Sequence, residues 1–374
     1  MNSNRSKQKI INIVSNYSSI YGGNFIPSLH ELAKHLVANN FKVIFTFPLD
    51  AKNRNWINYL KVDDLIEICF INFSNYKKFK KEIRKINKAK NVSILYIHFI
   101  SMLRMKLLYL FNKKIKLICH EHSDFRGGHT DSFFTKIKRF FEYKVFRKDA
   151  KYIFVSKSLK DEHTNKKNLF YVPNALCTER VPCQKIDLSK FKNEHNINDS
   201  DIVFLIFAWS PYVKGLDTAI KAFLNTNSSN KKLVVVHGKN NGYNNCVSYL
   251  NNKLGNSDFL NDNRIILVSP SEDVFSFYAL ADAFISSSRS EGFSYSILEA
   301  LYFDLPVFST DIDGVQWCKK YKNVKFFNAN NDKELSNLIN SFKRPKEKKI
   351  DTNIAIEFDI QTWCESIIKI LANL

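Results

Sequence analysis

The order of apolar segments in this chain of 374 residues predicts an α/β protein with two doubly wound domains. Short apolar strands alternate with helical segments of a dozen residues or more, which is typical of parallel sheets with helices on both faces. A chain of this length can form about two domains that each bury a core. A polar stretch that ends near residue 200 separates the two rounds, so we place the domains at residues 1–175 and 200–357.

In the first half, each expected strand is an apolar run bounded by polar or turn-forming residues. The loop after the first strand contains Gly22 and Gly23, and Pro27 marks the start of the next helix. Residues 74–90 are predicted to form a basic amphipathic helix with one apolar stripe. The expected strands are 9–15, 42–47, 65–70, 94–98, 116–119 and 152–155, and further helices are expected near 99–112 and 131–148.

The second half repeats this alternation, beginning with the apolar strand 202–208. A weaker strand–helix unit is expected near 324–341, and residues 360–374 form a last amphipathic helix. Ligands bind outside the carboxyl ends of the strands in such sheets, so the cleft between the domains is the expected site. The other expected strands are 233–236, 265–268, 283–286 and 307–308, and the helices are 216–224, 244–254, 272–280 and 295–303.

Composition excludes several classes of protein. No apolar run approaches the roughly 18–20 residues that cross a bilayer, so an integral membrane protein is excluded. The short apolar stretch near the N-terminus leads into Ser15 and Asn16, which indicates a first strand rather than a signal peptide. The cysteines number 7, without a Cys-x-x-Cys pair. This usage indicates a reduced, cytosolic setting, with neither a disulfide framework nor a zinc site.

Positive charge is concentrated in the first part of the chain. The chain carries 56 basic and 36 acidic residues, a net charge of +20, and residues 1–150 hold +17 of it, from 28 basic and 11 acidic residues. This asymmetry indicates an anionic partner, which could be nucleic acid, a membrane surface or acidic small molecules. The alternative is a solvated face that only keeps the protein soluble. No helix-turn-helix, zinc or RNA-binding motif appears, so nucleic acid is not expected as the partner.

A strand, a glycine-containing loop and a helix start follow one another at residues 282–304. Ser294 or Ser296 is the expected helix cap. Backbone N–H groups of the loop and the positive end of the helix dipole suit a phosphate or a sugar oxygen. Glu291 in the loop and Glu299 in the helix offer two carboxylates that can accept hydrogen bonds from one extended ligand. By spacing alone, two surface charges would also explain these glutamates.

The same stretch resembles the signature of retaining nucleotide-sugar glycosyltransferases with the GT-B fold, in which two glutamates are separated by seven residues. The resemblance implies that Glu291 contacts the donor sugar and that Glu299 binds the ribose hydroxyls. It also implies that Gly292, Phe293 and Ser294 offer backbone donors to the sugar and the diphosphate.

The loop after the strand 202–208 carries a second element of this resemblance. Lys214 would meet the donor pyrophosphate and stabilise the charge that builds up on the leaving nucleotide. Family members often have an arginine five residues earlier, where this chain has Trp209. Lys239 or Arg289 is the cation expected to compensate. A further departure is Asp304, because a small residue such as glycine is usual at that position.

The first half carries weaker elements of the resemblance. Gly22 and Gly23 resemble the glycines that let a phosphate approach the backbone, although such a pair alone is usually only a turn. Family members also have a histidine near the reacting sugar, and here the choice is between His122, which we prefer, and His120. A metal site at these residues is not expected because no downstream ligand pair completes it. His98 is expected to be a packed core histidine.

The resemblance implies a GT-B architecture, in which two Rossmann-like domains face each other across a cleft. The first domain would bind the acceptor and the second the nucleotide sugar. Residues 358–374 resemble the closing helix, which in this fold packs back onto the N-terminal domain.

The implied activity is transfer of a sugar from a nucleoside diphosphate sugar, with UDP-sugar as the default by family frequency. Transfer would retain the anomeric configuration through a front-face displacement, with no metal and no other cofactor. The expected acceptor is a glycan or a lipid-linked molecule in bacterial capsule, wall-polymer or other surface-glycan assembly. The expected location is cytoplasmic and peripheral on the inner face of the plasma membrane. The basic helices 74–90 and 131–148 would bind that anionic surface, unless their apolar residues pack in the core.

Two other functions remain alternatives. A non-catalytic glycosyltransferase-like subunit, acting as a binding partner, would keep the fold, and Trp209 is the residue in its favour. A phosphorylase is less favoured because no pyridoxal-binding pattern is evident in the sequence.

Overall fold

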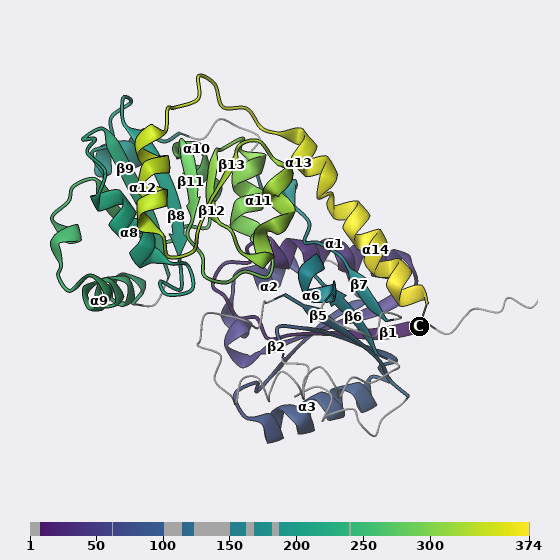
Figure 1. The fold of residues 1–374 in the computed structure, drawn as a ribbon. Coiled ribbons are helices and arrows are strands. Elements are labelled where there is room, and N and C mark those ends of the chain that lie inside the picture. The colour runs from purple at the N-terminus through teal and green to yellow at the C-terminus, as the bar shows by residue number, and fades with distance from the viewer. Residues whose placement is uncertain are drawn as a thin grey trace, which may run out of the picture. The chain divides into compact units, whose positions relative to one another are not determined.

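In the computed structural model the chain divides into two compact units, each built around a parallel sheet (Figure 1). The first unit comprises Met1–Ser123, His129–Cys177 and Phe358–Leu374, and the second comprises Asp124–Gly128 and Thr178–Glu357. The structure describes residues 8–61, 63–100, 114–122, 150–161, 168–181, 187–238 and 241–373. Two doubly wound parallel sheets with helices confirm the predicted α/β fold class.

The described part of the first unit contains a seven-stranded sheet in the order β3-β2-β1-β4-β5-β6-β7. β2 lies beside β1 and β3 lies beside β2. The chain then returns, so that β4 lies on the other side of β1 and the strand order reverses between β1 and β4. The strands are β1 (Lys9–Ser15), β2 (Phe41–Pro48), β3 (Ile66–Ile71), β4 (Ile94–His98), β5 (Lys116–Glu121), β6 (Lys151–Phe154) and β7 (Leu169–Tyr171).

Helices cover this sheet because alternate strand residues point to opposite faces. On one face Ile11 and Ile13 belong to a core that also contains residues of α1 and α14. On the other face Val14 belongs to a core that contains Phe79 and Ile83 of α3. Figure 1 shows α14, in yellow, running beside α1. The helices are α1 (Phe25–Ala38), α2 (Trp56–Tyr59), α3 (Tyr76–Ala89), α6 (Lys157–Asp161) and α14 (Ile360–Ala372), with a 3-10 helix η1 (Leu49–Asn53).

The described part of the second unit contains a six-stranded sheet in the order β10-β9-β8-β11-β12-β13. The strand order reverses between β8 and β11, which is the switch point at which α/β sheets bind ligands. The strands are β8 (Ile202–Ala208), β9 (Lys231–His237), β10 (Ile265–Val268), β11 (Ala283–Ser286), β12 (Val307–Thr310) and β13 (Val324–Phe327).

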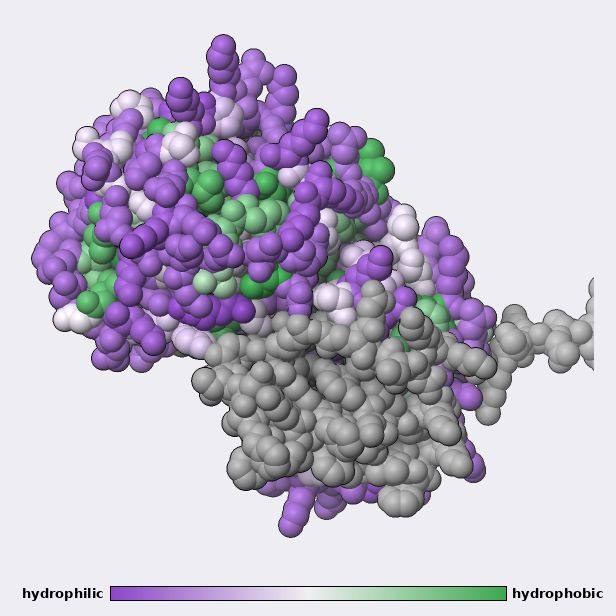
Figure 2. All heavy atoms as spheres, viewed as in Figure 1, coloured by the Kyte–Doolittle hydropathy of each residue, from purple (hydrophilic) through white to green (hydrophobic). Residues whose placement is uncertain are grey.

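The second unit buries its own apolar core between this sheet and its helices. Figure 2 shows that the surface of this unit, on the face drawn, is mainly hydrophilic with scattered hydrophobic patches, as is normal for a folded domain. Its helices are α7 (Ser189–Glu194), α8 (Leu216–Leu224), α9 (Gly242–Leu254), α10 (Phe275–Leu280), α11 (Tyr295–Tyr302), α12 (Asp332–Ser341) and α13 (Thr352–Glu357). The 3-10 helices are η2 (Thr178–Arg180), η3 (Asp258–Leu260) and η4 (Asp313–Lys320).

Several expectations for individual elements need correction. The polar stretch taken as a linker contains η2 and α7, and the short strand β7 precedes it. The helix expected over 272–280 begins only at Phe275, because the Asp273 carboxylate accepts from the backbone N–H of Ser276 and the preceding residues form a loop. The helices expected near 99–112 and 131–148 lie outside the described residues, apart from residues 99 and 100, which are not helical.

Among the helices that the structure describes, none combines the length and the apolar character needed to cross a bilayer.

Candidate functional site

In the second unit, the loops that follow β8 and β11 are held together by hydrogen bonds. The Ser287 hydroxyl lies 2.9 Å from the carbonyl oxygens of both Lys214 and Gly215, and the backbone N–H of Arg289 donates to Val213. Gly215 has a positive φ of 60°, and a Cβ at this position would lie 2.0 Å from the Ser287 carbonyl oxygen. Only glycine therefore fits here, and it brings the two loops close enough for their side chains to meet.

Lys214 and Glu291 meet where these loops converge. The Lys214 ammonium lies 2.5 Å from Glu291 Oε1, and the Ser288 hydroxyl donates to the same oxygen over 2.7 Å. The two side chains are 11% and 12% exposed, so the pair lies in a poorly solvated place where charge–charge attraction is strong. The backbone of Glu291 is fixed as well, because Gly314 packs so closely against its carbonyl oxygen that any Cβ would clash.

Glu299 lies on α11, and its carboxylate contacts two other elements. The Tyr278 hydroxyl of α10 donates to Oε2 over 2.7 Å. The Arg180 guanidinium of η2 lies 3.8 Å from Oε1 and stacks over the ring of Phe275. Burial, together with the neighbouring carboxylate, raises the pKa of Tyr278 well above its usual value, so this phenol stays a neutral hydrogen-bond donor. The carboxylate is thereby held in one orientation.

The start of α11 differs in one respect from the sequence-based expectation. Ser294 is the N-cap residue and has an extended backbone, but its side chain makes no capping bond and lies 3.0 Å from the Ser296 hydroxyl. Ser294, one of the two serines expected at the cap, is therefore the N-cap residue, although its hydroxyl makes no hydrogen bond to the backbone of the first turn. Phe293 is buried and stacks on Trp317 at 4.6 Å between ring centroids, which fixes the loop just before the helix. Gly292 is buried beside it.

Arg289 is engaged in a structural ion pair. Its guanidinium donates to both carboxylate oxygens of Asp217 at 2.8 Å and to the carbonyl oxygen of Tyr212. The Tyr249 hydroxyl also donates to Asp217. The charge of Arg289 is thus largely neutralised by Asp217, so the structure gives no support to the expectation that it serves as a compensating cation. Lys239, the other expected cation, lies outside the described residues.

Trp209 stands where the resemblance leads us to expect an arginine. Its side chain is 66% exposed, and the Lys214 ammonium lies 5.6 Å from the centroid of its ring. The indole therefore offers Lys214 a cation–π contact instead of a second positive charge.

The first unit has its own loop region at the corresponding strand ends, after β1 and β4. Gly23 adopts a positive φ of 54°, and the Tyr17 hydroxyl lies 3.1 Å from the carbonyl oxygen of Gly22. A Cβ on Gly22 would lie 3.0 Å from the Ile26 side chain, so this glycine packs closely against α1. The two glycines therefore shape a tight loop that leads into α1.

Histidines gather at the ends of β4 and β5. His98 and His120 are paired neighbours in the parallel sheet, and His98 Nδ1 lies 2.8 Å from His122 Nε2. His120 is buried and shares a hydrogen bond with the Tyr96 hydroxyl, whereas His122 is half-buried. Burial lowers the pKa of all three rings, that of His122 to about 3, so they are neutral near pH 7. His98 is buried as expected, but it belongs to this cluster.

The predicted site residues thus fall into two groups. Lys214, Glu291 and the start of α11 lie together in the second unit, and the paired glycines and histidines lie in the first.

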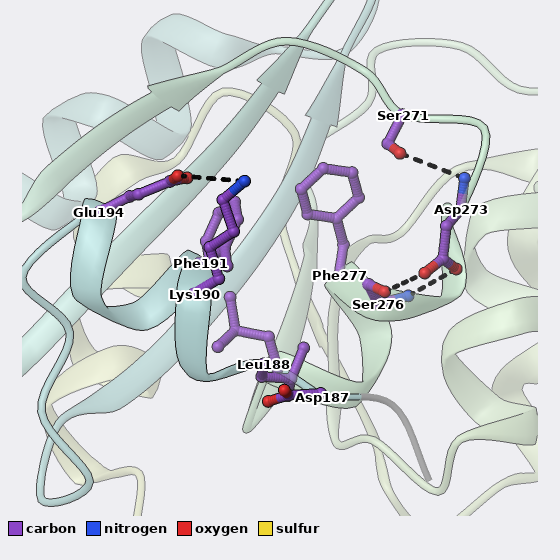
Figure 3. Close-up of a pocket in the computed structure, with 10 residues that line it drawn as sticks. Asp187, Leu188, Lys190, Phe191, Glu194, Ser271, Asp273, Ser276 and Phe277 are labelled. Atoms are coloured by element: carbon purple, nitrogen blue, oxygen red, sulfur yellow. Dashed lines mark hydrogen bonds and ion pairs between the residues drawn. The ribbon is translucent and has the colours of Figure 1, made fainter. Parts of the chain in front are cut away.

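A pocket of about 330 Å³ lies elsewhere in the second unit, between α7 and the start of α10 (Figure 3). Phe191 and Phe277 meet edge to face in it, and Lys190 and Glu194 pair at its rim. None of its lining residues was singled out from the sequence, and it does not include the loops after β8 and β11.

Comparison with known proteins places both units in glycosyltransferase families. The model of glycosyl transferases group 1 matches residues 187–355, and the model of glycosyltransferase family 4 matches residues 28–180. The two matches follow one another along most of the chain. The chain belongs to the GT-B glycosyltransferases of the family-four type.

Solved structures share this fold at low sequence identity. HepE from Anabaena, in complex with UDP and glucose, is 16% identical with a TM-score of 0.76, and the alignment covers 98% of this chain and 100% of that chain. Sucrose-phosphate synthase from Thermosynechococcus elongatus is 12% identical with a TM-score of 0.75, and 98% of each chain is covered. WaaG, a glycosyltransferase involved in lipopolysaccharide biosynthesis, is 13% identical with a TM-score of 0.65, covering 95% of this chain and 93% of that chain. No curated protein sequence gives a match.

The departure of this glycosyltransferase at Asp304 has a structural explanation. Asp304 follows α11 and has a positive φ of 53°, the left-handed conformation in which glycine is favoured. Aspartate is one of the few other residues that adopt this conformation. α11 is therefore followed by the left-handed conformation that glycine favours, but with an aspartate, for which this conformation costs more.

Sequence reasoning missed Tyr278 and Arg180, which lie far from Glu299 along the chain and contact it only through the fold. No local signal marks either residue. Ser288, by contrast, lies within the recognised stretch and could have been named as a partner of Glu291.

Proposed function

We propose that this glycosyltransferase moves a sugar from a nucleoside diphosphate sugar to an acceptor with retention of the anomeric configuration, and that the donor binds in the second unit. The observation that carries the proposal is the buried Lys214–Glu291 pair at the switch point of the sheet. UDP is the default nucleotide, and it is the one bound in the Anabaena HepE structures.

The residues around the switch point suit the parts of such a donor. The Lys214 ammonium would bind the diphosphate, and Glu291 would accept hydrogen bonds from the sugar hydroxyls. Binding would separate the present ion pair and give each charge a new partner, so that neither is left buried alone. The backbone of Gly292, Phe293 and Ser294, at the positive end of α11, would donate to the sugar and the diphosphate. The oriented carboxylate of Glu299 would take the ribose hydroxyls.

The reaction proposed is a front-face displacement. The acceptor oxygen bonds to the anomeric carbon as the bond from that carbon to the diphosphate oxygen breaks. The departing phosphate oxygen takes the proton of the acceptor hydroxyl, so no protein nucleophile is needed. Lys214 and the dipole of α11 would stabilise the leaving diphosphate in place of a metal ion. In the first unit, His122 would contact the sugar or the acceptor, and the loop at Gly22 and Gly23 would approach the phosphates.

The acceptor we propose is a glycan or a lipid-linked molecule in bacterial surface-glycan assembly, at the inner face of the plasma membrane. The helix α3 offers a basic surface for this membrane. However, its apolar residues Phe79 and Ile83 are buried in the core, so they are not available for insertion into lipid. Asn87 is also buried and accepts a hydrogen bond from Asn12 of β1. Only the lysines and Arg84 of α3 would face the membrane, and each would contribute about 1 kcal/mol by electrostatics.

A thermal-shift panel tests the donor proposal. UDP, GDP, ADP and CMP, with their sugars, are added to the wild-type protein and to Lys214→Ala, with Lys221→Ala as the control because Lys221 is an exposed lysine of α8. One nucleotide should raise the Tm of the wild type and of Lys221→Ala, and the rise should grow with the nucleotide concentration. The same nucleotide should raise the Tm of Lys214→Ala much less. No stabilisation by any nucleotide would contradict the proposal.

Membrane binding is tested separately, by flotation with anionic and neutral liposomes at ~0.15 M salt, where screening still permits adsorption at short range. The wild type should float only with anionic vesicles, and charge reversal of two α3 lysines should abolish this. Full recovery of the wild type in the soluble fraction would contradict the membrane proposal and leave the donor proposal standing.

A non-catalytic binding subunit is the second candidate, because Trp209 replaces an expected cation beside Lys214. It predicts nucleotide binding without release of UDP from a UDP-sugar, whether or not acceptors are present.

A further inference from the structure

Three histidines converge in the first unit, where β4 and β5 lie side by side. The sheet register pairs His98 with His120, and His122 follows two residues later, on the same side of the sheet as His120. Each ring offers one nitrogen, and the three nitrogens all lie within 4.8 Å of one another. The rings of His120 and His122 are stacked with their centroids 4.3 Å apart.

Two ring nitrogens of this cluster are buried without a hydrogen-bond partner among the described residues. They are Nε2 of His98 and Nε2 of His120, whose side chains belong to residues 0% and 3% exposed. A buried polar atom without a hydrogen-bond partner destabilises the folded protein. A ligand bound between the rings would give the two Nε2 atoms of His98 and His120 a partner.

The cluster also has the protonation state and the outer contacts that a metal site requires. Burial lowers the pKa of the three histidines, and the neutral imidazole is the form that binds metal ions. The Tyr96 hydroxyl, 2.7 Å from Nδ1 of His120, holds that ring and leaves Nε2 to the ligand. Phe25 and Phe99 pack against His122, so the cluster has an apolar wall.

We propose that His98, His120 and His122 form a binding site for one divalent transition-metal ion of the zinc class. Three imidazoles with an open fourth position suit Zn²⁺ or Co²⁺, whereas Mg²⁺ and Ca²⁺ prefer oxygen ligands. Two nitrogens bound to one tetrahedral ion are about 3.3 Å apart. His98 and His120 would bind the ion through their unpartnered Nε2 atoms. His122 would bind it through Nε2 after its half-buried ring turns out of the stack with His120, which breaks the 2.8 Å contact with His98 Nδ1 and leaves the proton of that contact on His98 Nδ1.

Occupation of this site would have a consequence for transfer. His122 is the histidine proposed to contact the sugar or the acceptor, and an ion would take its nitrogen. We therefore expect Zn²⁺ to inhibit the glycosyltransferase and a chelator to restore its activity. This consequence rests on the proposed function, whereas the binding site itself does not.

Titration of the metal-free protein with Co²⁺, followed by visible absorption, tests the site without any donor. The variants are His98→Ala, His120→Ala, His122→Ala and Tyr96→Phe, and His195→Ala is the matched control because this histidine lies in the second unit and stacks on Phe191. The wild type and the control should bind one ion per chain with the intense absorption of tetrahedral Co²⁺. Loss of any of the three histidines should weaken binding by about 100-fold or more, and Tyr96→Phe by about tenfold.

Failure of the wild type to take up one ion would overturn the proposal, as would uptake that is the same in all three histidine variants. If the variants at the two buried histidines do not fold, the half-buried His122→Ala variant and the wild-type stoichiometry still decide the question. Since the nucleotide panel reports on the second unit, its outcome and the Co²⁺ result can be read independently.

Discussion

The hydroxyl of Tyr278 donates a hydrogen bond of 2.7 Å to Oε2 of Glu299, and both residues are buried in the second unit. This contact joins α10 to α11 and fixes the carboxylate that we propose binds the ribose of the donor. It therefore connects the stability of the unit with its affinity for a nucleotide.

Replacing Tyr278 with phenylalanine removes this bond and leaves the packing of the ring unchanged. Because the acceptor is a charged carboxylate, we expect the free energy of unfolding to fall by about 1.5–3 kcal/mol. Urea denaturation measures this loss, with Tyr243→Phe as the control because Tyr243 is 47% exposed. UDP affinity should also fall in Tyr278→Phe. Equal stability of the two variants would show that the bond contributes nothing.

Glu299→Ala is expected to weaken donor binding more than it slows turnover. The loss of one or two charged hydrogen bonds to the ribose, at about 1.5–3 kcal/mol each, corresponds to a rise in Kd of at least tenfold. Titration of UDP by calorimetry measures it, and kcat at saturating donor should change much less. Glu194→Ala, on the exposed part of α7, is the control. An unchanged Kd for UDP in Glu299→Ala would contradict the assignment of the ribose to this residue.

The histidine cluster predicts that the first unit loses stability in mild acid. Burial lowers the pKa of these rings below 6.5, that of His122 to about 3, so the folded state stays neutral while the unfolded state binds protons below about pH 6.5. Extra protons on the unfolded state lower the free energy of unfolding as pH falls. For His122, whose pKa falls to about 3, the loss is about 2 kcal/mol between pH 7 and pH 5, and the two buried histidines change stability in the same direction.

Urea denaturation in the presence of a chelator, at pH 7 and pH 5, checks this loss in the wild type and in His122→Asn. The variant has one such group fewer, so its decrease between the two pH values should be smaller by about 2 kcal/mol. Identical decreases would show that His122 is protonated in the folded state as readily as in the unfolded state.

Asp304→Gly is expected to stabilise the second unit. Asp304 has a φ of 53°, and a left-handed conformation is less costly for glycine than for any residue with a Cβ. The expected gain is about 0.5–1 kcal/mol, after allowance for the greater freedom of glycine in the unfolded chain. Thermal unfolding measures it. Asp304→Ala keeps the Cβ and should give no gain, so equal gains from both substitutions would exclude the backbone explanation.

Lys214→Ala and Glu291→Gln are expected to slow transfer severely. Lys214→Ala removes a group that stabilises the leaving diphosphate, at a cost of about 2.7–4 kcal/mol, which corresponds to a decrease in kcat of about 100- to 1000-fold. We expect a decrease of the same size for Glu291→Gln, which removes the charge that orients the donor sugar. The assay uses the nucleotide sugar that stabilises the wild type best, and Lys221→Ala is again the control. Near-normal turnover by both purified variants would refute their roles.

Sequence patterns predicted most elements because short apolar runs bounded by turn residues and apolar residues at helical spacing leave little choice of structure. β1, β4 and α8 have the bounds expected from their apolar residues and their bounding turns. The short elements β7 and α7 were missed because their sequences are too short to show a clear period. β7 pairs with β6, and Phe191 of α7 contacts Phe277 of α10.

The sequence predicted those residues of the candidate site that lie within short recognisable stretches of the chain. Glu291 and Glu299 lie within one stretch of sequence, and the recognised loop supplied Lys214. The hydrogen bond from Tyr278 to Glu299 and the ion pair between Arg180 and Glu299 depend on how α10 and η2 pack, which no sequence period records. Likewise, His98 joins His120 only because β4 and β5 are neighbours in the sheet.

A crystal structure of the protein with UDP, or with the nucleotide that stabilises it best, tests the central claim most directly. The account predicts the diphosphate against the Lys214 ammonium, with the Lys214–Glu291 contact opened from 2.5 Å and the ribose hydroxyls on Glu299. A nucleotide bound elsewhere on the chain, with the Lys214–Glu291 pair still closed, would contradict it.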